Sequence, residues 1–527
     1  MKKTWNFVEY VFHNKSESDR NLYLFRKKWI TLGEIGTIAG QMAELFMSAG
    51  LKPSERILLF LDDTPAAVGC FLGAIQAGMV PVLLNPQSKK DYIKHYIKDS
   101  KCTSIVCEPR VVSVIQTIQK SLLNDVKVWQ QDLYRSANDN LHLDLKGIRT
   151  ALNLSPFDGY LYNDCESDFW QYTSGTTGMP KAVRQSTQGM VENTELYAKA
   201  ILNISGNDCI YSTAKLFFGY GLGNSVFFPL LRGARAILDE RWPTPDIIVE
   251  IIQTNRPTIL FSVPTIYLNI IDHGENITRA MGNNARYVSA GAPLPGAIFN
   301  AWRYRYNIEI LDGIGATEMG HIFLSNRPGS AQAGSTGKTL KGYEVKLMTS
   351  VDTTAKYEEQ GVLYVKGPSV AKGYYNDPTN TAHRFSDGWY ITGDVFTQNP
   401  EGIFTYVGRQ DDLFKVKGRW ISPQNIESFI TTHFPMIREA ALIPAVSNSG
   451  DVTPVLYYAT NEDQPKIKEI ENHISQYLAE GFGSYVVPKE YFVISQLPKN
   501  DNGKFMRNAL STTLPQDSQQ LELIKFH

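Results

Sequence analysis

The sequence predicts an α/β protein with a large N-terminal domain and a small α+β C-terminal domain. The chain has 527 residues, which is longer than most single domains. Before Gly361, short apolar runs alternate with helical patterns, which is typical of mixed or parallel sheets covered by helices. After Gly361, short strands with glycine turns precede two helical patterns.

The N-terminal part contains a clear strand–helix–strand pattern. Residues 56–63 (RILLFLDD) form a short apolar run, residues 65–78 (PAAVGCFLGAIQAG) have helical spacing and a closing glycine, and residues 80–85 (VPVLLN) form the next strand. Further buried strands that end in turn residues are predicted at 103–109, 257–264 and 285–294. Ligands of such sheets bind at the carboxyl ends of the strands.

The C-terminal part has a different order of predicted elements. Short strands are predicted within 361–375 and 402–422, followed by helices at 423–434 and 466–482. We therefore predict an N-terminal domain over residues 1–408, a hinge at 409–411 and a C-terminal domain over 412–527.

The composition narrows the class of protein. Hydrophobic residues make up 43% of the chain, and 52 lysines and arginines balance 53 aspartates and glutamates. This balance gives no electrostatic reason to expect nucleic acid or an anionic membrane as a partner. No run approaches the ~18 apolar residues of a spanning helix, and no signal-type run follows the N-terminus. The five scattered cysteines have no metal-binding spacing, so we expect reduced thiols in a cytoplasmic protein.

The segment YTSGTTGMPKAV, residues 172–183, is rich in glycine and hydroxyl residues. Glycines let backbone amides approach a polyphosphate without obstruction by Cβ, and hydroxyl groups donate to its oxygens. Lys181 adds a mobile positive charge. The segment does not match the GxxxxGK[ST] loop, and by itself such a loop is most often a turn.

Other polar turns follow in order along the chain. They are SAGAPLP (289–295), DGIGATEMGHIF (312–323), GWYITGDV (388–395), VGRQDDLFKVKG (407–418) and PKNDNGK (498–504). Taken singly, each has a structural explanation: Glu318 suits a helix start, Asp394 a cap and Lys504 a solvated surface. The ordered set favours a functional reading.

With these motifs in this order, the chain resembles the adenylate-forming superfamily of acyl-CoA synthetases, nonribosomal adenylation domains and luciferases, over about residues 30–511. Residues 215–224 (KLFFGYGLGN), 312–329 (DGIGATEMGHIFLSNRPG) and 415–427 (KVKGRWISPQNIE) most resemble the benzoate:CoA ligase group. The resemblance implies that a carboxylate attacks the α-phosphate of ATP, and that the thiol of coenzyme A then displaces AMP. It also implies Mg²⁺, a mobile C-terminal domain and, because dimers are common in the family, a homodimer.

The resemblance assigns roles to named residues. The phosphate loop is Thr173, Ser174, Gly175, Thr176, Thr177 and Gly178 with Lys181. Thr317 contacts the α-phosphate and Glu318 the Mg²⁺. The adenine side comprises Gly291, Ala292, Pro293, Asp312, Gly313, Ile314, Gly315 and Ala316. Asp394 accepts from the ribose hydroxyls near Arg409, and Lys504 bridges carboxylate and phosphate. Asp411 is the hinge residue, and Lys417, Gly418 and Trp420 face coenzyme A.

The expected acyl pocket is compact and lacks charge. It comprises Phe218, Gly219, Tyr220, Gly221, Ala290, His321 and Ile322. Tyr220 can stack on a flat ring, while His321 either touches the ring edge or packs in the core. With no lysine, arginine or acid suggesting a second charged group, a benzoate-like acid fits best. Gly219 stands where the closest relatives are expected to carry alanine, which leaves room for a somewhat larger ring.

Other functions share these motifs. A stand-alone adenylation enzyme would load the pantetheine thiol of a carrier protein and would ignore free coenzyme A. A non-catalytic nucleotide-binding protein would bind ATP or AMP without turnover, and the intact set of charged residues argues against it. A luciferase-like oxygenase is the most remote alternative.

Overall fold

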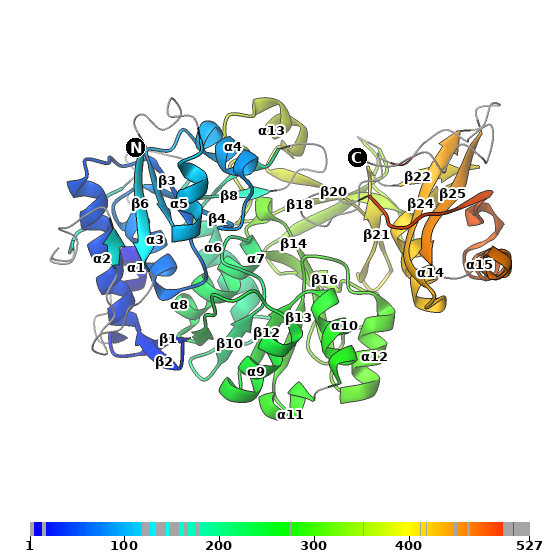
Figure 1. The fold of residues 1–527 in the computed structure, drawn as a ribbon, viewed down its shortest axis with the longest axis horizontal. Helices are drawn as coiled ribbons and strands as arrows, with labels where there is room; N and C mark the ends of the chain where they lie inside the picture. Colours follow the sequence, from blue (N-terminus) through cyan, green and yellow to red (C-terminus); the bar gives the residue numbers. More distant parts are fainter. Residues whose placement is uncertain are drawn as a thin grey trace. The chain divides into compact units, whose positions relative to one another are not determined.

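The computed structural model describes residues 5–12, 17–118, 126–132, 144–146, 157–162, 167–173, 179–274, 276–350, 352–411, 413–417, 419–446, 451–460, 464–498 and 510. Within these residues the strands form sheets with helices packed against them (Figure 1). The predicted α/β class is confirmed.

The first sheet has the strand order β7–β6–β5–β3–β4–β8–β9. Its inner strands are parallel, and β7 and β9 are antiparallel to their neighbours. The strands are β3 (Arg56–Phe60), β4 (Val80–Leu84), β5 (Ser104–Cys107), β6 (Lys127–Asp132), β7 (Asp144–Lys146), β8 (Phe169–Thr173) and β9 (Lys181–Gln185). The helices of this region are α1 (Phe7–Phe12), α2 (Leu32–Ser48), α3 (Pro65–Gln76), α4 (Lys90–Ser100) and α5 (Pro109–Ile115).

Helix α3 is buried along its whole length and approaches α2 closely. A Cβ on Gly69 would lie 2.2 Å from Cγ2 of Ile38, and one on Gly73 would lie 2.5 Å from the carbonyl oxygen of Ala39. The two glycines are therefore required by helix packing, although glycine weakens an isolated helix.

Several helices begin with the same local signal. The pairs Thr64–Pro65, Thr244–Pro245 and Ser422–Pro423 stand at the N-termini of α3, α9 and α14, and each hydroxyl oxygen accepts a hydrogen bond from a first-turn amide. The hydroxyl satisfies an amide that has no partner within the helix, and proline already has a helical φ. These helix starts are thus encoded locally.

The second sheet has the order β16–β15–β14–β13–β12–β10–β11–β1–β2. Its strands are β1 (Asn21–Phe25), β2 (Lys28–Thr31), β10 (Cys209–Ser212), β11 (Arg235–Ile237), β12 (Ile259–Ser262), β13 (Arg286–Ser289), β14 (Ile310–Gly315), β15 (Ile322–Ser325) and β16 (Lys338–Thr339). Helices α9 (Pro245–Asn255), α10 (Pro264–His273) and α12 (Gly296–Tyr306) lie side by side over it (Figure 1). The other α-helices between β9 and β14 are α6 (Thr187–Asn193), α7 (Gly219–Leu222), α8 (Phe228–Arg232) and α11 (Ile277–Met281).

Helical segments of other types accompany these helices. A π-helical turn at Gly223–Phe227 joins α7 to α8, another at Thr194–Lys199 extends α6, and a 3₁₀ turn spans Thr317–Met319. Such turns are often found next to functional sites.

The remaining strands follow Lys341. A third sheet has the order β17–β18–β20–β19, with β21 paired to β20. Its strands are β17 (Glu344–Met348), β18 (Gly361–Lys366), β19 (Phe385–Ser386), β20 (Trp389–Gln398) and β21 (Phe404–Arg409), with helix α13 (Pro378–Arg384). The C-terminal elements are β22 (Phe414–Val416), β23 (Arg419–Ile421), α14 (Pro423–His433), β24 (Ile437–Val446), β25 (Val452–Thr460), α15 (Gln464–Phe482), a 3₁₀ turn (Ser484–Val486) and β26 (Glu490–Val493).

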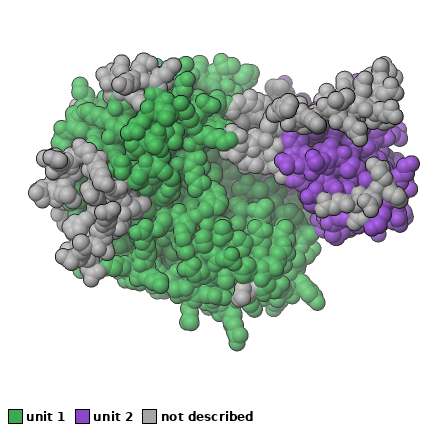
Figure 2. All heavy atoms as spheres, in the orientation of Figure 1, with its two compact units in different colours: residues 1–346, 364–392, 399–405 green, residues 347–363, 393–398, 406–527 purple. Residues whose placement is uncertain are grey.

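The chain divides into two compact units (Figure 2). The first comprises residues 1–346, 364–392 and 399–405, and the second comprises residues 347–363, 393–398 and 406–527. The last stretch of the second unit begins at Tyr406, shortly before the hinge predicted at residues 409–411.

Two expectations from composition can be compared with the structure. Within the described ranges, no helix is long and apolar enough to cross a membrane. The described cysteines, Cys70, Cys102, Cys107 and Cys209, are buried free thiols, as expected.

Candidate active site

The predicted adenine-side residues leave the same edge of the second sheet. Strands β13 and β14 are parallel, and Ser289 pairs with Asp312. The segments 290–293 and 313–316 therefore follow at or beyond neighbouring carboxyl ends, where ligands of such sheets bind. Gly291 has φ +84°, a value that favours glycine and allows the chain to turn away after β13. Burial raises the pKa of Asp312 well above the ordinary range of a carboxyl group.

Glu318 lies in the 3₁₀ turn that follows β14 and is only 6% exposed. The Tyr374 hydroxyl donates to Oε1 of Glu318 at 2.7 Å. The turn itself is held from two sides, because the Ala371 amide donates to the Glu318 carbonyl at 2.8 Å and Nε2 of Gln185 donates to the Thr317 carbonyl at 2.5 Å. These contacts hold the backbone of the turn and one oxygen of the Glu318 carboxylate.

Lys181 is the first residue of β9 and pairs in register with Thr173, the last residue of β8. Its Nζ atom lies 5.5 Å from the centre of the Tyr374 ring. Lys181, Tyr374 and Glu318 thus form a connected row of a cation, an aromatic ring and a carboxylate. The loop residues Ser174, Gly175, Thr176, Thr177 and Gly178 lie outside the described residues.

The donor set around Glu318 fits a divalent cation that is also bound by phosphate. A hard cation such as Mg²⁺ takes carboxylate and phosphate oxygens and usually keeps several waters. Over the described part of the chain, no group of three or more His, Cys, Asp or Glu side chains could hold a metal ion alone. Glu318 would supply one carboxylate ligand to such a cation.

Asp394 and Arg409 lie together in the second unit. Nη1 of Arg409 donates to Oδ1 of Asp394 at 2.9 Å, between adjacent strands β20 and β21. A turn follows in which the Gln410 amide donates to the Gly393 carbonyl at 2.8 Å and Asp411 comes next. The residues expected to contact ribose and to form the hinge are therefore neighbours in this unit.

Of the residues predicted on the coenzyme A side, Lys417 directly follows β22 and Trp420 lies in β23. Lys417 has φ +49°, and Val416 pairs with Arg419 across the turn. The Trp420 side chain is exposed, and Nζ of Lys415 lies 4.4 Å from the centre of its ring. Gly418 and Lys504 lie outside the described residues.

The predicted acyl pocket is built on the short helix α7. The Tyr220 ring lies 5.5 Å from the His321 ring between centres, and its hydroxyl donates to the Val288 carbonyl at 3.3 Å. Ala290 and Ile322 are buried, whereas Phe218 is 53% exposed. A Cβ on Gly219 would lie 3.1 Å from Oε1 of Gln171 and 3.2 Å from the Gly320 carbonyl oxygen, so the glycine permits a close approach of three segments.

His321 is buried against aromatic rings rather than exposed to water. Its Nε2 lies 3.1 Å from Oδ1 of Asn224, and its ring centre lies 4.7 Å from that of Phe228. Burial lowers its pKa to about 3, so the imidazole is neutral near pH 7. Of the two sequence-based readings of His321, packing is observed directly, and contact with a substrate ring stays a prediction.

His321 should make stability depend on pH. Its pKa falls from 6.5 in the unfolded chain to about 3 in the folded protein. The unfolded state therefore binds the extra proton, so this contribution is complete above pH 6.5 and is lost as the pH falls toward 3. Against a His321→Gln variant, the wild type should lose about 1 kcal/mol more between pH 6.5 and 5.5. Urea unfolding at these pH values measures the free energy of unfolding of both proteins. If that free energy changes equally with pH in wild type and variant, the lowered pKa of His321 is contradicted.

Some residues of the site were not identified from the sequence. Tyr374 lies in a segment that the sequence predicts only as strand and turn. Asn224 ends the motif at 215–224 and Gln185 follows the motif at 172–183, but no sequence pattern marks either residue as functional. Only their contacts with Glu318, Thr317 and His321 reveal them. The sole hint for Tyr374 is its place beside a glycine in residues 373–375.

Comparison with known proteins defines the class. Residues 12–375 match the model of the AMP-binding enzyme family, and residues 425–504 match that of the AMP-binding enzyme C-terminal domain. The chain belongs to the AMP-binding enzyme family. This confirms the adenylate-forming superfamily that the motifs predict.

Particular relatives are similar over nearly the whole chain. The anthranilate–CoA ligase of Pseudomonas aeruginosa is 36% identical, with 96% of each chain covered. The 4-hydroxybenzoate–CoA/benzoate–CoA ligase of Rhodopseudomonas palustris is 32% identical, covering 95% of this chain and 93% of that protein. The crystal structure of a benzoate CoA ligase from Burkholderia xenovorans has a TM-score of 0.81 at 31% identity, covering 96% of this chain and 99% of the other.

Proposed function

We propose that this protein is an aryl-CoA ligase that activates a small aromatic carboxylic acid with ATP. In the first step a carboxylate oxygen of the acid bonds to the α-phosphorus, and the bond to pyrophosphate breaks. In the second step the thiol of coenzyme A loses its proton and its sulfur bonds to the acyl carbon. AMP then leaves with the electron pair of the acyl–oxygen bond.

The observation that carries this proposal is the fixed Glu318 carboxylate beside the end of β14. The Tyr374 hydroxyl holds one of its oxygens, and Nζ of Lys181 lies over the same tyrosine ring. A cation held by Glu318 and phosphate oxygens would offset negative charge that shifts within the polyphosphate. Preorganised charges of this kind supply much of the rate enhancement in such transfers.

The remaining residues suit binding and alignment of the nucleotide. Asp394 can accept hydrogen bonds from both hydroxyls of a ribose, because a carboxylate has two acceptor oxygens, and Arg409 holds that carboxylate in place. Lys504 is assigned to bridge the acid and the α-phosphate in the first step. Thr317 is assigned to the α-phosphate.

The proposed acid is benzoate or a benzoate carrying a small substituent. The residues assigned to the acyl pocket include Tyr220, the neutral His321 imidazole and the small or aliphatic residues Ala290 and Ile322. Such a lining accepts a flat ring and provides no cation for a second carboxylate. The relatives named above act on anthranilate, hydroxybenzoate and benzoate, which supports the same class of acid.

The test is AMP release from ATP with a panel of small carboxylic acids, each with and without free coenzyme A. We expect coenzyme A-dependent AMP formation with benzoate, aminobenzoates or hydroxybenzoates, and little with acetate or long-chain acids. A panel that yields no AMP with any aromatic acid, while another class of acid is active, would contradict the proposed substrate.

A stand-alone adenylation enzyme is the second candidate. One relative, 28% identical over 92% of this chain and 65% of its own length, is a p-hydroxybenzoic acid–AMP ligase of Mycobacterium tuberculosis. If that reading holds, aromatic acids will support pyrophosphate exchange while free coenzyme A fails to stimulate AMP release. A pantetheine-bearing carrier protein would then be the acceptor.

A further inference from the structure

Lys215 is a buried lysine in the loop between β10 and α7, and it has no role in the mechanism above. The residue is 8% exposed. Its Nζ donates to the Asp239 carbonyl at 2.7 Å and to the Arg241 carbonyl at 2.6 Å, and lies 3.8 Å from Oδ2 of Asp63. A buried ammonium group requires partners for its charge and donors. The two carbonyls accept hydrogen bonds from Lys215, and the Asp63 carboxylate lies within ion-pair distance.

These partners come from both large sheets of the first unit. Asp63 follows β3 in the first sheet, whereas the segment 238–241 follows β11 in the second. The other oxygen of Asp63, Oδ1, accepts from the Leu216 amide at 3.0 Å. One lysine therefore ties its own loop to the carboxyl ends of strands in two sheets.

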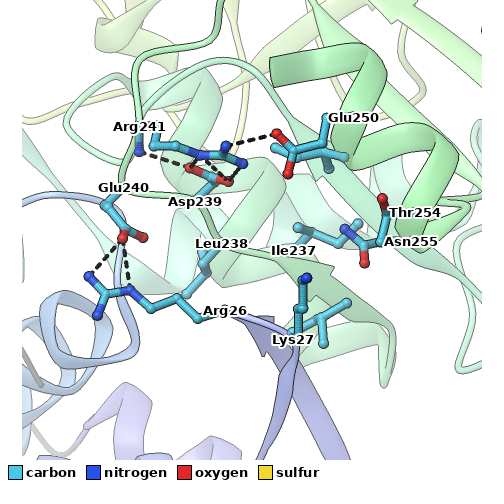
Figure 3. Close-up of a pocket in the computed structure, with 12 residues that line it drawn as sticks. Arg26, Lys27, Ile237, Leu238, Asp239, Glu240, Arg241, Glu250, Thr254 and Asn255 are labelled. Atoms are coloured by element: carbon cyan, nitrogen blue, oxygen red, sulfur yellow. Dashed lines mark hydrogen bonds and ion pairs between the residues drawn. The ribbon is translucent and has the colours of Figure 1, made fainter. Parts of the chain in front are cut away.

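The segment that carries the carbonyl partners also makes ion pairs through its own side chains (Figure 3). Nη2 of Arg241 lies 2.7 Å from Oδ2 of Asp239, and Nη1 of Arg241 lies 2.9 Å from Oε2 of Glu250. Nη2 of Arg26 lies 2.7 Å from Oε1 of Glu240. These side chains line a cavity of about 210 Å³. The acidic residues Asp239, Glu240 and Glu250 of this cavity each have an ion-pair partner, and these pairs connect the segment 239–241 to Arg26 and to helix α9.

The backbone of Lys215 supports the helix of the acyl pocket. The Phe218 amide donates to the Lys215 carbonyl at 3.0 Å. A Cβ on Gly221 would lie 2.1 Å from that carbonyl oxygen, so α7 rests directly on the loop backbone. Helix α7 also carries Tyr220, whose ring neighbours His321. A shift of the loop would therefore move the aromatic wall of the pocket.

We propose that Lys215 is a positioning residue for the acyl pocket, holding α7 and Tyr220 at the distance from His321 that suits a compact aromatic acid. This inference rests on the proposed function. Asp63 is its matched partner, because burial raises the pKa of that carboxyl group to about 6 and the ammonium group of Lys215 is the leading influence that opposes the rise.

The test compares wild type with Lys215→Met, which keeps an unbranched side chain only one atom shorter and removes the charge. The KM for the aromatic acid should rise about tenfold or more, because a small displacement of α7 misplaces the ring. The KM for ATP should stay within about twofold, since the side-chain partners of Lys215 are Asp63, Asp239 and Arg241, which lie outside the turns after β13 and β14. Preference for benzoate over bulkier aromatic acids should also weaken.

A second variant distinguishes a local displacement of α7 from unfolding of the protein. Lys215→Met leaves the Asp63 carboxylate buried without its cation, whereas Lys215→Met combined with Asp63→Asn removes both charges and retains an oxygen acceptor for the Leu216 amide. The double variant should fold and still show the selective rise in KM for the acid. If the two KM values move together, or neither moves, the proposal is wrong.

Hydrogen exchange separates this inference from the proposed function, because it needs no substrate. Amides in residues 214–224 should exchange faster in both variants, while a peptide over residues 437–446, in strand β24, should be unchanged. If wild type activates no aromatic acid, the proposed function fails, and the exchange experiment still decides whether Lys215 holds α7. Unchanged exchange in residues 214–224 would overturn the positioning role.

Discussion

Replacing Glu318 with glutamine should lower the rate of adenylate formation by about 10²- to 10³-fold, the usual cost of removing one preorganised charged group from a reacting centre. The glutamine keeps the shape of the side chain and can still accept a hydrogen bond from Tyr374. It loses the negative charge that a divalent cation prefers. Pyrophosphate release in a single turnover without coenzyme A measures this step directly.

The matched control is Tyr374→Phe, which keeps the carboxylate and removes only the hydroxyl that donates to it. A net loss of about 1 kcal/mol for one hydrogen bond corresponds to a decrease of less than about tenfold. Glu318→Gln should also raise the Mg²⁺ concentration that gives half-maximal rate, and it should do so more than Tyr374→Phe. A Glu318→Gln enzyme with wild-type rate and wild-type Mg²⁺ dependence would remove Glu318 from the metal site.

Replacing Asp411 with proline should slow thioester formation by about 10²-fold or more while leaving adenylate formation within about threefold of wild type. The hinge assignment requires the backbone at this position to change between the two steps, and proline fixes φ near −65°. The backbone hydrogen bonds of the turn run from the Gln410 amide to Gly393 and from the Leu413 amide to Arg409, on either side of Asp411. The substitution therefore restrains the turn without removing those bonds.

The two half-reactions are measured separately. Pyrophosphate release without coenzyme A reports the first step, and transfer from a preformed aryl-adenylate to coenzyme A reports the second. Asp411→Ala is the control, because it removes the same side chain and leaves φ free. Equal losses in both half-reactions, or equal behaviour of the alanine and proline variants, would argue against a hinge at this residue.

Much of the fold can be predicted from local sequence. The apolar run at 56–63, the helical spacing at 65–78 and the run at 80–85 correspond to β3, α3 and β4. The Thr64–Pro65 start of α3 is likewise readable, because capping and proline geometry depend on adjacent residues. The class of the protein follows from the order of its glycine-rich and acidic turns, and the family models bear out that class.

The sequence by itself determined the local elements, the order of the motifs and the family, because each depends on residues close together in the chain. Only the tertiary structure decided that Tyr374 holds Glu318, that Lys215 joins Asp63 to the loop after β11, and that burial lowers the pKa of His321. Those contacts join distant segments, and that pKa depends on burial from all sides. Neither is encoded in the periodicity of a single segment, since both arise from the packing of the sheets and helices on one another.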